Sequence, residues 1–218
     1  MMPKGCLFDM DGILLDTERL SLTLTLQIAA QHGYVISESL FNQTLGVTDE
    51  MTKHIFMQGL GPEFPYELVA AEIYHAYVAH AKAGTTPRKA GMAECIAGLK
   101  ARGMRLALAT SANRALVEIY LQAIPEFNGT FDAVVCGTDI AKSKPEPDIY
   151  LLAAEKLGLT PDVCIGVEDS RNGLMSLTAA GIRSVMIPDL LPYDESYAGI
   201  VTWVIPSLTE LCGLVDGL

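Results

Sequence analysis

The pattern of apolar residues separates the chain into two kinds of segment. Short, mostly apolar runs lie at residues 5–8, 104–109, 133–136, 163–167, 184–187 and 201–205. Such runs are typical of strands that are buried on both faces of a parallel sheet. Segments with helical spacing alternate with them from residue 85 onward, which predicts an α/β fold with a Rossmann-like parallel sheet and helices on both faces. The helices predicted in this part cover residues 92–102, 114–123, 148–157 and 172–180.

A block of helical sequence separates the first apolar run from the others. Residues 17–32 are ambiguous, because leucines alternate with threonines as in a strand, but the length of the segment favours a helix. Further helices are predicted to begin at Ser37 and Thr48 and to cover residues 65–82. We therefore predict an inserted helical cap between two linkers. The predicted domains are an α/β catalytic core of residues 1–16 and 85–218 and a cap of residues 17–84.

The composition narrows the classes of partner. With 26 acidic and 15 basic residues, the formal net charge is −11, which argues against a nucleic-acid or acidic-membrane partner. No stretch is long and apolar enough for a membrane span, and acidic residues interrupt the N-terminal apolar run, so we expect no secretory signal. The five dispersed cysteines form no C-x-x-C pair, which is typical of reduced core residues in a cytoplasmic protein. We expect a monomer or a weak dimer.

The first apolar run ends abruptly at an acidic pair. Asp9 and Asp11 follow it, and Gly12 comes next. If the backbone stays extended, side chains two residues apart point the same way, so the two carboxylates would share one place and repel each other. A bound cation would remove this repulsion, whereas a simple turn is the alternative reading, since Asp and Gly are common in turns. A calcium loop of the EF-hand type fits poorly, because Leu14 stands where that loop needs glycine.

Further polar side chains follow the later strands, at the edge where open parallel sheets bind ligands. Most have a simpler explanation. The hydroxyls of Thr110 and Ser111 could cap the next helix, a single loop lysine is normally solvated, and Glu168 and Asp169 could be a solvated pair in a loop. Several such coincidences at one edge of one sheet nevertheless favour a site. The residues in question are Thr110, Ser111, Asn113, Lys144, Glu168 and Asp169.

Carboxylates, a lysine and hydroxyls gathered at one place suit phosphoryl transfer. Hard oxygen ligands in a small site suit Mg²⁺, and a carboxylate beside Mg²⁺ can attack phosphorus to form an aspartyl-phosphate. The transferring group needs its charge neutralised by the metal and by a cation. The candidates for this second task are Lys144, Thr110 and the backbone N–H groups near Gly12 and Ser111.

Taken together, the motifs resemble those of the haloacid dehalogenase (HAD) superfamily. The D-x-D-G opening, the Thr/Ser after the second strand, the lysine before P-x-P and the G-x-E-D-S stretch occur in that family's order. The likeness covers essentially the whole chain and is strongest to the β-phosphoglucomutase-like branch, which has a small helical cap. It implies that the cap closes on the substrate and excludes water.

The resemblance also implies roles for the acidic residues. Asp9 would be the nucleophile and a metal ligand, and Asp11 would be the general acid/base, with its backbone carbonyl on the metal. Asp169 would be a direct metal ligand, and Glu168 would be a further ligand or, in the reading we favour, a partner of the ligands. The phosphoryl group would be held by Thr110 and Lys144.

Departures from the family's pattern reduce the number of reactions that the chain is expected to catalyse. Sugar-phosphate mutases of this branch carry a histidine where this chain has Ser21, and basic residues around the segment where it has Leu45 and Asp49. Hydrolysis is therefore favoured, and a sugar-phosphate mutase is the alternative. True dehalogenases lack an acid two residues after the nucleophile, so Asp11 disfavours carbon–halogen cleavage.

We expect Mg²⁺-dependent hydrolysis of a small phosphomonoester, a sugar phosphate or a nucleotide-type compound, through an aspartyl-phosphate. A non-enzymatic phospho-receiver module is a remote alternative, because it also gathers Asp, Thr and Lys at strand ends. Its phosphorylated aspartate would follow the third strand, near Asp139, and the helical block argues against it. The candidate substrate contacts are Asn113, Glu18 and His54.

Overall fold

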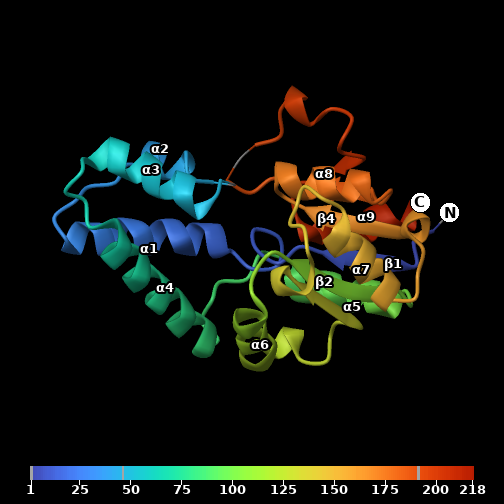
Figure 1. Cartoon of the computed structure of the whole chain (residues 1–218). Coiled ribbons are helices and arrows are strands. Elements are labelled where there is room, and N and C mark those ends of the chain that lie inside the picture. The colour runs from blue at the N-terminus through green and yellow to red at the C-terminus, as the bar shows by residue number, and fades with distance from the viewer. Residues whose placement is uncertain (1, 46, 191) are drawn as a thin grey trace. The chain divides into compact units, whose positions relative to one another are not determined.

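The structure is a computed structural model that describes residues 2–45, 47–190 and 192–218 (Figure 1). Its internal contacts divide the chain into two compact units. The core unit comprises Met1–Asp16 and Pro87–Leu218, and the helical unit comprises Thr17–Thr86. Among the described residues, every helix is too short or too polar to cross a bilayer.

In the described part of the core unit, six strands form one parallel sheet in the order β3-β2-β1-β4-β5-β6. The predicted α/β fold with a Rossmann-like parallel sheet is thus confirmed, with strand ends displaced by one residue in several places. The last strand is shorter than predicted. The strands are β1 (Gly5–Phe8), β2 (Arg105–Thr110), β3 (Ala133–Cys136), β4 (Cys164–Glu168), β5 (Arg183–Met186) and β6 (Trp203–Val204).

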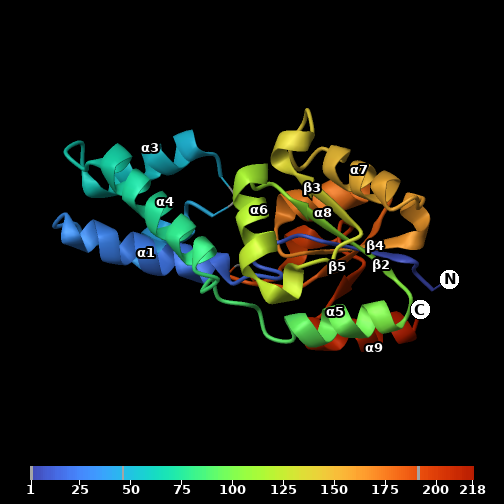
Figure 2. The ribbon, with the colours of Figure 1, turned by 90° about the horizontal axis from the view of Figure 1, so that it is seen from below.

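Helices cover both faces of the sheet (Figure 2). Helices α7 and α8 pack together on one face, and α5 and α9 pack together on the other. Strand β1 is central and all four of its residues are buried, which is why its sequence is apolar without alternation. The helices of the core unit are α5 (Met92–Ala101), α6 (Arg114–Ala123), α7 (Asp148–Lys156), α8 (Arg171–Ala179) and α9 (Leu211–Asp216).

The helical unit consists of four helices in its described part, coloured blue to green in Figure 1. Ser37 and Thr48 cap the second and third helices, because their hydroxyls accept hydrogen bonds from backbone N–H groups three residues later. Buried Phe41, Phe56 and Phe64 form its apolar interior. The helices are α1 (Thr17–Gln31), α2 (Glu38–Asn42), α3 (Asp49–Leu60) and α4 (Tyr66–Lys82).

The segment in which the chain leaves the core unit is hydrogen-bonded to the segment in which it returns. The N–H of Asp16 donates to the carbonyl of Pro87, and the N–H of Lys89 donates to the carbonyl of Leu14. The Lys89 ammonium lies 2.7 Å from a carboxylate oxygen of Asp189, in the loop after β5. The segments that lead out of the core unit and back into it are therefore anchored to the sheet that carries the candidate site.

Candidate active site

The register of the sheet brings the ends of three strands to one level. Phe8 of β1 pairs with Leu108 of β2 and with Val167 of β4. One residue further along the chain, Asp9 and Glu168 are therefore neighbours at the carboxyl edge of the sheet. This is the edge at which open parallel sheets bind ligands.

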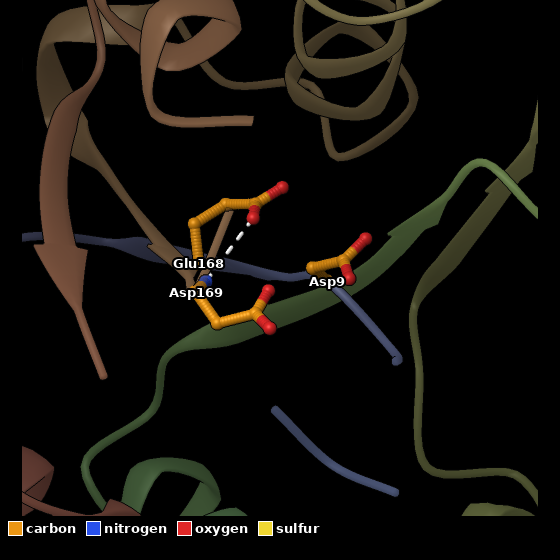
Figure 3. A group of neighbouring side chains, drawn as sticks. All are labelled: Asp9, Glu168 and Asp169. Carbon is orange, nitrogen blue, oxygen red and sulfur yellow. Dashed lines mark hydrogen bonds between the residues drawn. The ribbon is translucent and has the colours of Figure 1, made fainter. Parts of the chain in front are cut away.

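Three carboxylates converge at this edge (Figure 3). Asp9, Glu168 and Asp169 each offer an oxygen, and these oxygens lie within 4.8 Å of one another. Glu168 is fully buried, Asp9 is 8% exposed and Asp169 is half-buried. In Figure 3 the carboxylate of Asp169 points toward Asp9, whereas Glu168 turns back toward the amide of Asp169.

One ammonium group contacts two of these carboxylates. Nζ of Lys144 lies 2.6 Å from Oδ1 of Asp9 and 2.7 Å from Oε1 of Glu168, and it donates a third hydrogen bond of 3.2 Å to the carbonyl of Ala109. The Lys144 side chain is only 7% exposed. An ammonium has three N–H groups, so each has an acceptor in this arrangement.

Burial and the ion pairs act in opposite directions on the pKa values of the site. It raises the pKa of Asp9 from 3.8 to about 8, although Lys144 acts in the opposite direction. Burial alone would lower the pKa of Lys144, but the charges of Asp9 and Glu168 outweigh it and raise that pKa. For Glu168 burial would raise the pKa, but Lys144 and the hydrogen bonds to the carboxylate outweigh it and lower that pKa. Lys144 thus stays charged, and a further cation beside Asp9 would favour the ionised form of its carboxyl group.

The donor set fits a hard divalent cation. Three carboxylates face one ammonium, so the cluster carries excess negative charge. Carboxylate and carbonyl oxygens are the ligands that Mg²⁺ prefers in proteins. The carboxylates of Asp9 and Asp169 are the oxygens best suited to hold such an ion.

Thr110 and Gly12 complete the edge of the site. The Thr110 hydroxyl, fully buried at the end of β2, donates to Oδ2 of Asp11 over 3.5 Å and accepts from the N–H of Ala112. Gly12 has a φ of 74°, and a Cβ at this position would overlap the carboxylate of Asp169. Glycine is therefore needed both for the left-handed backbone and for the close approach.

Comparison with known proteins gives the family. A family model for haloacid dehalogenase-like hydrolases matches residues 6–187. The chain belongs to this family. Protein CbbY of Rhodobacter capsulatus is 34% identical over 217 residues, with 94% of each chain covered. Hexitol phosphatase B of Escherichia coli O157:H7 is 30% identical, with 95% of this chain and 93% of the relative covered.

A solved structure supports the same assignment. The crystal structure of CbbY from Rhodobacter sphaeroides in complex with phosphate has a TM-score of 0.76 and 29% identity to this chain, and 96% of each chain is covered. The relatives include named phosphatases, so this chain is an enzyme of the phosphatase branch of the HAD hydrolases.

Glu168 is already saturated with hydrogen bonds in this HAD hydrolase. Its Oε2 accepts from the N–H groups of Asp169 and Ser170 and from the Ser170 hydroxyl, and its Oε1 accepts from Lys144 and Tyr150. A carboxylate offers about four lone-pair sites, so five donors leave none for a metal. The geometry favours Glu168 as the residue that organises Lys144 and the loop after β4.

Three other residues predicted to belong to the site have local roles or positions in this structure. The Asn113 side chain accepts from the N–H of Leu116 and caps α6. The N–H of Gly12 donates to the carbonyl of Leu15, so it is engaged in a turn in this structure. Ser111 lies in an exposed bend at the end of β2.

The helical unit contains a cavity of about 410 Å³ between its helices. Glu18 lines it, together with Asp49 and aromatic side chains from α3 and α4. Among the described residues, its lining includes no Lys, Arg or His. His54 instead lines a separate hollow on α3, so the structure does not bring the predicted substrate contacts Glu18 and His54 together.

Two residues of the site were not among the sequence candidates. Tyr150 contacts Glu168 from α7, and a Cβ at Gly173 of α8 would overlap the Glu168 carboxylate. Tyr150 falls on the apolar stripe of a helix, where a tyrosine is normally a packing residue. The only available signal for Gly173 was a glycine inside a helix, which is unfavourable unless something needs the space.

Proposed function

We propose that this hydrolase is a Mg²⁺-dependent phosphatase that cleaves a small phosphomonoester, a sugar phosphate or a nucleotide-type compound, through an aspartyl-phosphate. The observation that carries the proposal is the meeting of Asp9 with Asp169 and Lys144 at one buried place. The named phosphatases among its relatives support the same reaction class.

In the first step, an oxygen of Asp9 attacks phosphorus and the bond to the leaving oxygen breaks. Asp11 gives its proton to that oxygen, so the organic part leaves as a neutral hydroxyl. Lys144 and Thr110 hold the transferring phosphoryl group by hydrogen bonds to its oxygens. Bound Mg²⁺ would neutralise charge on the phosphoryl oxygens and keep Asp9 ionised.

In the second step, Asp11 takes a proton from water, whose oxygen attacks the phosphorus of the aspartyl-phosphate. The bond between phosphorus and Asp9 breaks, inorganic phosphate leaves, and both aspartates return to their starting protonation. The same carboxyl group thus acts as acid and then as base.

The helical unit is proposed to be the cap that selects the substrate. Its cavity combines aromatic side chains with two acidic residues, Glu18 and Asp49. This lining suits an uncharged organic group with an apolar face, and it would repel a second phosphate. A bisphosphate-dependent mutase is the less favoured reaction for the same reason.

The test is turnover of a panel of sugar phosphates and nucleoside monophosphates with and without Mg²⁺. We expect release of inorganic phosphate that depends on the metal and is lost in Asp9→Asn. Turnover that persists in Asp9→Asn would exclude the mechanism. An isomerised sugar phosphate formed without free phosphate would instead identify a mutase.

A further inference from the structure

A buried tyrosine contacts both members of the Lys144–Glu168 ion pair. The side chain of Tyr150 is fully buried, and its hydroxyl donates to Oε1 of Glu168 over 2.6 Å. The same oxygen accepts from Nζ of Lys144 over 2.7 Å. The ring of Tyr150 also lies against the ammonium, with 4.9 Å between Nζ and the ring centroid. Such a contact with an aromatic face attracts a cation.

The Glu168 carboxylate has no freedom to turn. Its Oε2 is held by the N–H of Asp169 and by the N–H and hydroxyl of Ser170. On the side of α8 it lies against Gly173, where even a methyl group would overlap it. Oε1 is therefore fixed as the oxygen that faces Lys144 (Figure 3 shows the hydrogen bond between Glu168 and the Asp169 amide).

The hydroxyl of Tyr150 limits how strongly Oε1 of Glu168 attracts the ammonium of Lys144. A carboxylate oxygen has two lone pairs, and Tyr150 occupies one of those on Oε1. One lone pair remains for the ammonium, whose other N–H groups go to Asp9 and to the carbonyl of Ala109. Without the hydroxyl, Oε1 would carry more uncompensated negative charge, so we expect the ammonium to shift toward Glu168 and away from Asp9.

We propose that Tyr150 is a positioning residue for phosphoryl transfer. By sharing Oε1 of Glu168 with Lys144, its hydroxyl keeps Nζ of Lys144 beside Asp9, where the phosphoryl group is transferred. This inference rests on the phosphatase function proposed above. It assigns to Tyr150 a task that its place in the core does not require, since a phenylalanine ring would fill the same space.

The first test is Tyr150→Phe, which removes the hydroxyl and keeps the ring. We expect kcat/KM to fall about tenfold, because a small displacement of a group that contacts the transferring phosphoryl is costly. Calorimetric titration with inorganic phosphate in the presence of Mg²⁺ should show a weaker Kd than for the wild type. The matched control is Tyr120→Phe on α6, which removes a hydroxyl from another fully buried tyrosine of the core unit. It should leave kcat/KM and the phosphate Kd within about twofold of the wild type.

The second test is a double-mutant cycle with Glu168→Gln. If Tyr150 acts through Glu168, Tyr150→Phe should change kcat/KM by less than about twofold in that background. A full tenfold further loss in the double variant would overturn the proposal. Should Glu168→Gln fail to fold, the phosphate Kd of Tyr150→Phe against Tyr120→Phe decides the matter alone, and equal values overturn it.

The outcomes separate this inference from the proposed function. If the wild type hydrolyses phosphomonoesters through Asp9 while Tyr150→Phe matches Tyr120→Phe, the inference fails and the function stands. If the wild type releases no phosphate from any ester of the panel, the function fails, and so does the role assigned to Tyr150.

Discussion

At the scale of single residues, Lys144 decides the electrostatics of the site. Its ammonium is nearly buried between two carboxylates, and its charge is what makes their burial tolerable. Lys142 lies two residues earlier in the same loop and is exposed. The two lysines therefore form a natural pair for comparison.

We expect Lys144→Met to lower kcat by about 100-fold or more, because it removes a preorganised hydrogen-bond donor from the transferring group. It should also lower the free energy of unfolding, because Asp9 and Glu168 lose their only contacting ammonium among the described residues. Phosphate release and urea unfolding measure the two effects. Lys142→Met is the control and should change neither; equal activity of the two variants would exclude the role given to Lys144.

Gly173 offers a second prediction at this scale. Alanine normally stabilises an exposed helix position by about 0.5–1 kcal/mol relative to glycine. At Gly173 the added methyl group would overlap the carboxylate of Glu168, so we expect Gly173→Ala to lower both activity and stability, the latter by about 1–3 kcal/mol.

Gly213 on α9 supplies the matched control. A Cβ at this position would meet nothing within 4 Å. Gly213→Ala should therefore leave kcat/KM unchanged and, if anything, raise the midpoint of urea unfolding. Two variants with the same unfolding midpoint would show that Glu168 does not need the space beside α8.

At the scale of elements, the parallel sheet explains which parts of the site were predictable. Asp9 directly follows the buried strand β1, and Glu168 is the last residue of the buried strand β4. In a parallel sheet, residues at these positions lie at the same edge. The apolar runs alone therefore pointed to their meeting. The hydrogen bond from the Tyr150 hydroxyl to Glu168 could not be predicted in this way. A tyrosine on the apolar stripe of a helix gives the same sequence pattern whether or not its hydroxyl bonds to a functional carboxylate. The saturation of Glu168 depends on five separate hydrogen bonds, which no spacing in the sequence encodes.

The helices of the helical unit lead to a prediction about substrate choice. If the cavity receives the organic part of the substrate, as proposed above, the best-hydrolysed sugar monophosphate should be preferred over the corresponding bisphosphate, because the Glu18 and Asp49 that line the cavity would repel a second phosphate. Asp49→Lys should raise the ratio of kcat/KM for the bisphosphate to kcat/KM for the monophosphate by about tenfold, which corresponds to a free-energy difference of roughly 1.4 kcal/mol. Steady-state kinetics with both substrates measure this ratio.

A second charge reversal serves as the control for this prediction. Glu38 is exposed on α2 and is not among the residues that line the cavity. Glu38→Lys makes the same change in net charge and should leave the ratio unaltered. If both variants change the ratio equally, the overall charge rather than the cavity selects the substrate.

At the scale of the whole molecule, we expect the acidic cluster to make the free energy of unfolding depend on pH and on a bound metal. Without a metal, the pKa of Asp9 is about 8 in the folded protein, and an aspartate that is exposed on unfolding has a pKa near 3.8. Between these values the folded state holds a proton that the unfolded state has lost, so the free energy of unfolding falls as the pH rises and levels off above the folded pKa. A divalent cation replaces the proton in the folded state, so the decrease should be suppressed by Mg²⁺.

The measurement is Tm from pH 5 to pH 9, in EDTA and in Mg²⁺, for the wild type and Asp9→Asn. In EDTA at pH 9, we expect the Tm of Asp9→Asn to exceed that of the wild type by at least about 3 °C, which corresponds to about 1 kcal/mol for a chain of this length. At pH 5 the difference in Tm should be much smaller. Mg²⁺ should raise the Tm of the wild type more than that of Asp9→Asn, because the ion loses a carboxylate ligand in the variant. Asp162→Asn, at an exposed carboxylate outside the cluster, should follow the wild type throughout. Parallel curves for the wild type and Asp9→Asn in EDTA would contradict the raised pKa of Asp9, and with it the pKa-based reason for expecting a metal at this cluster.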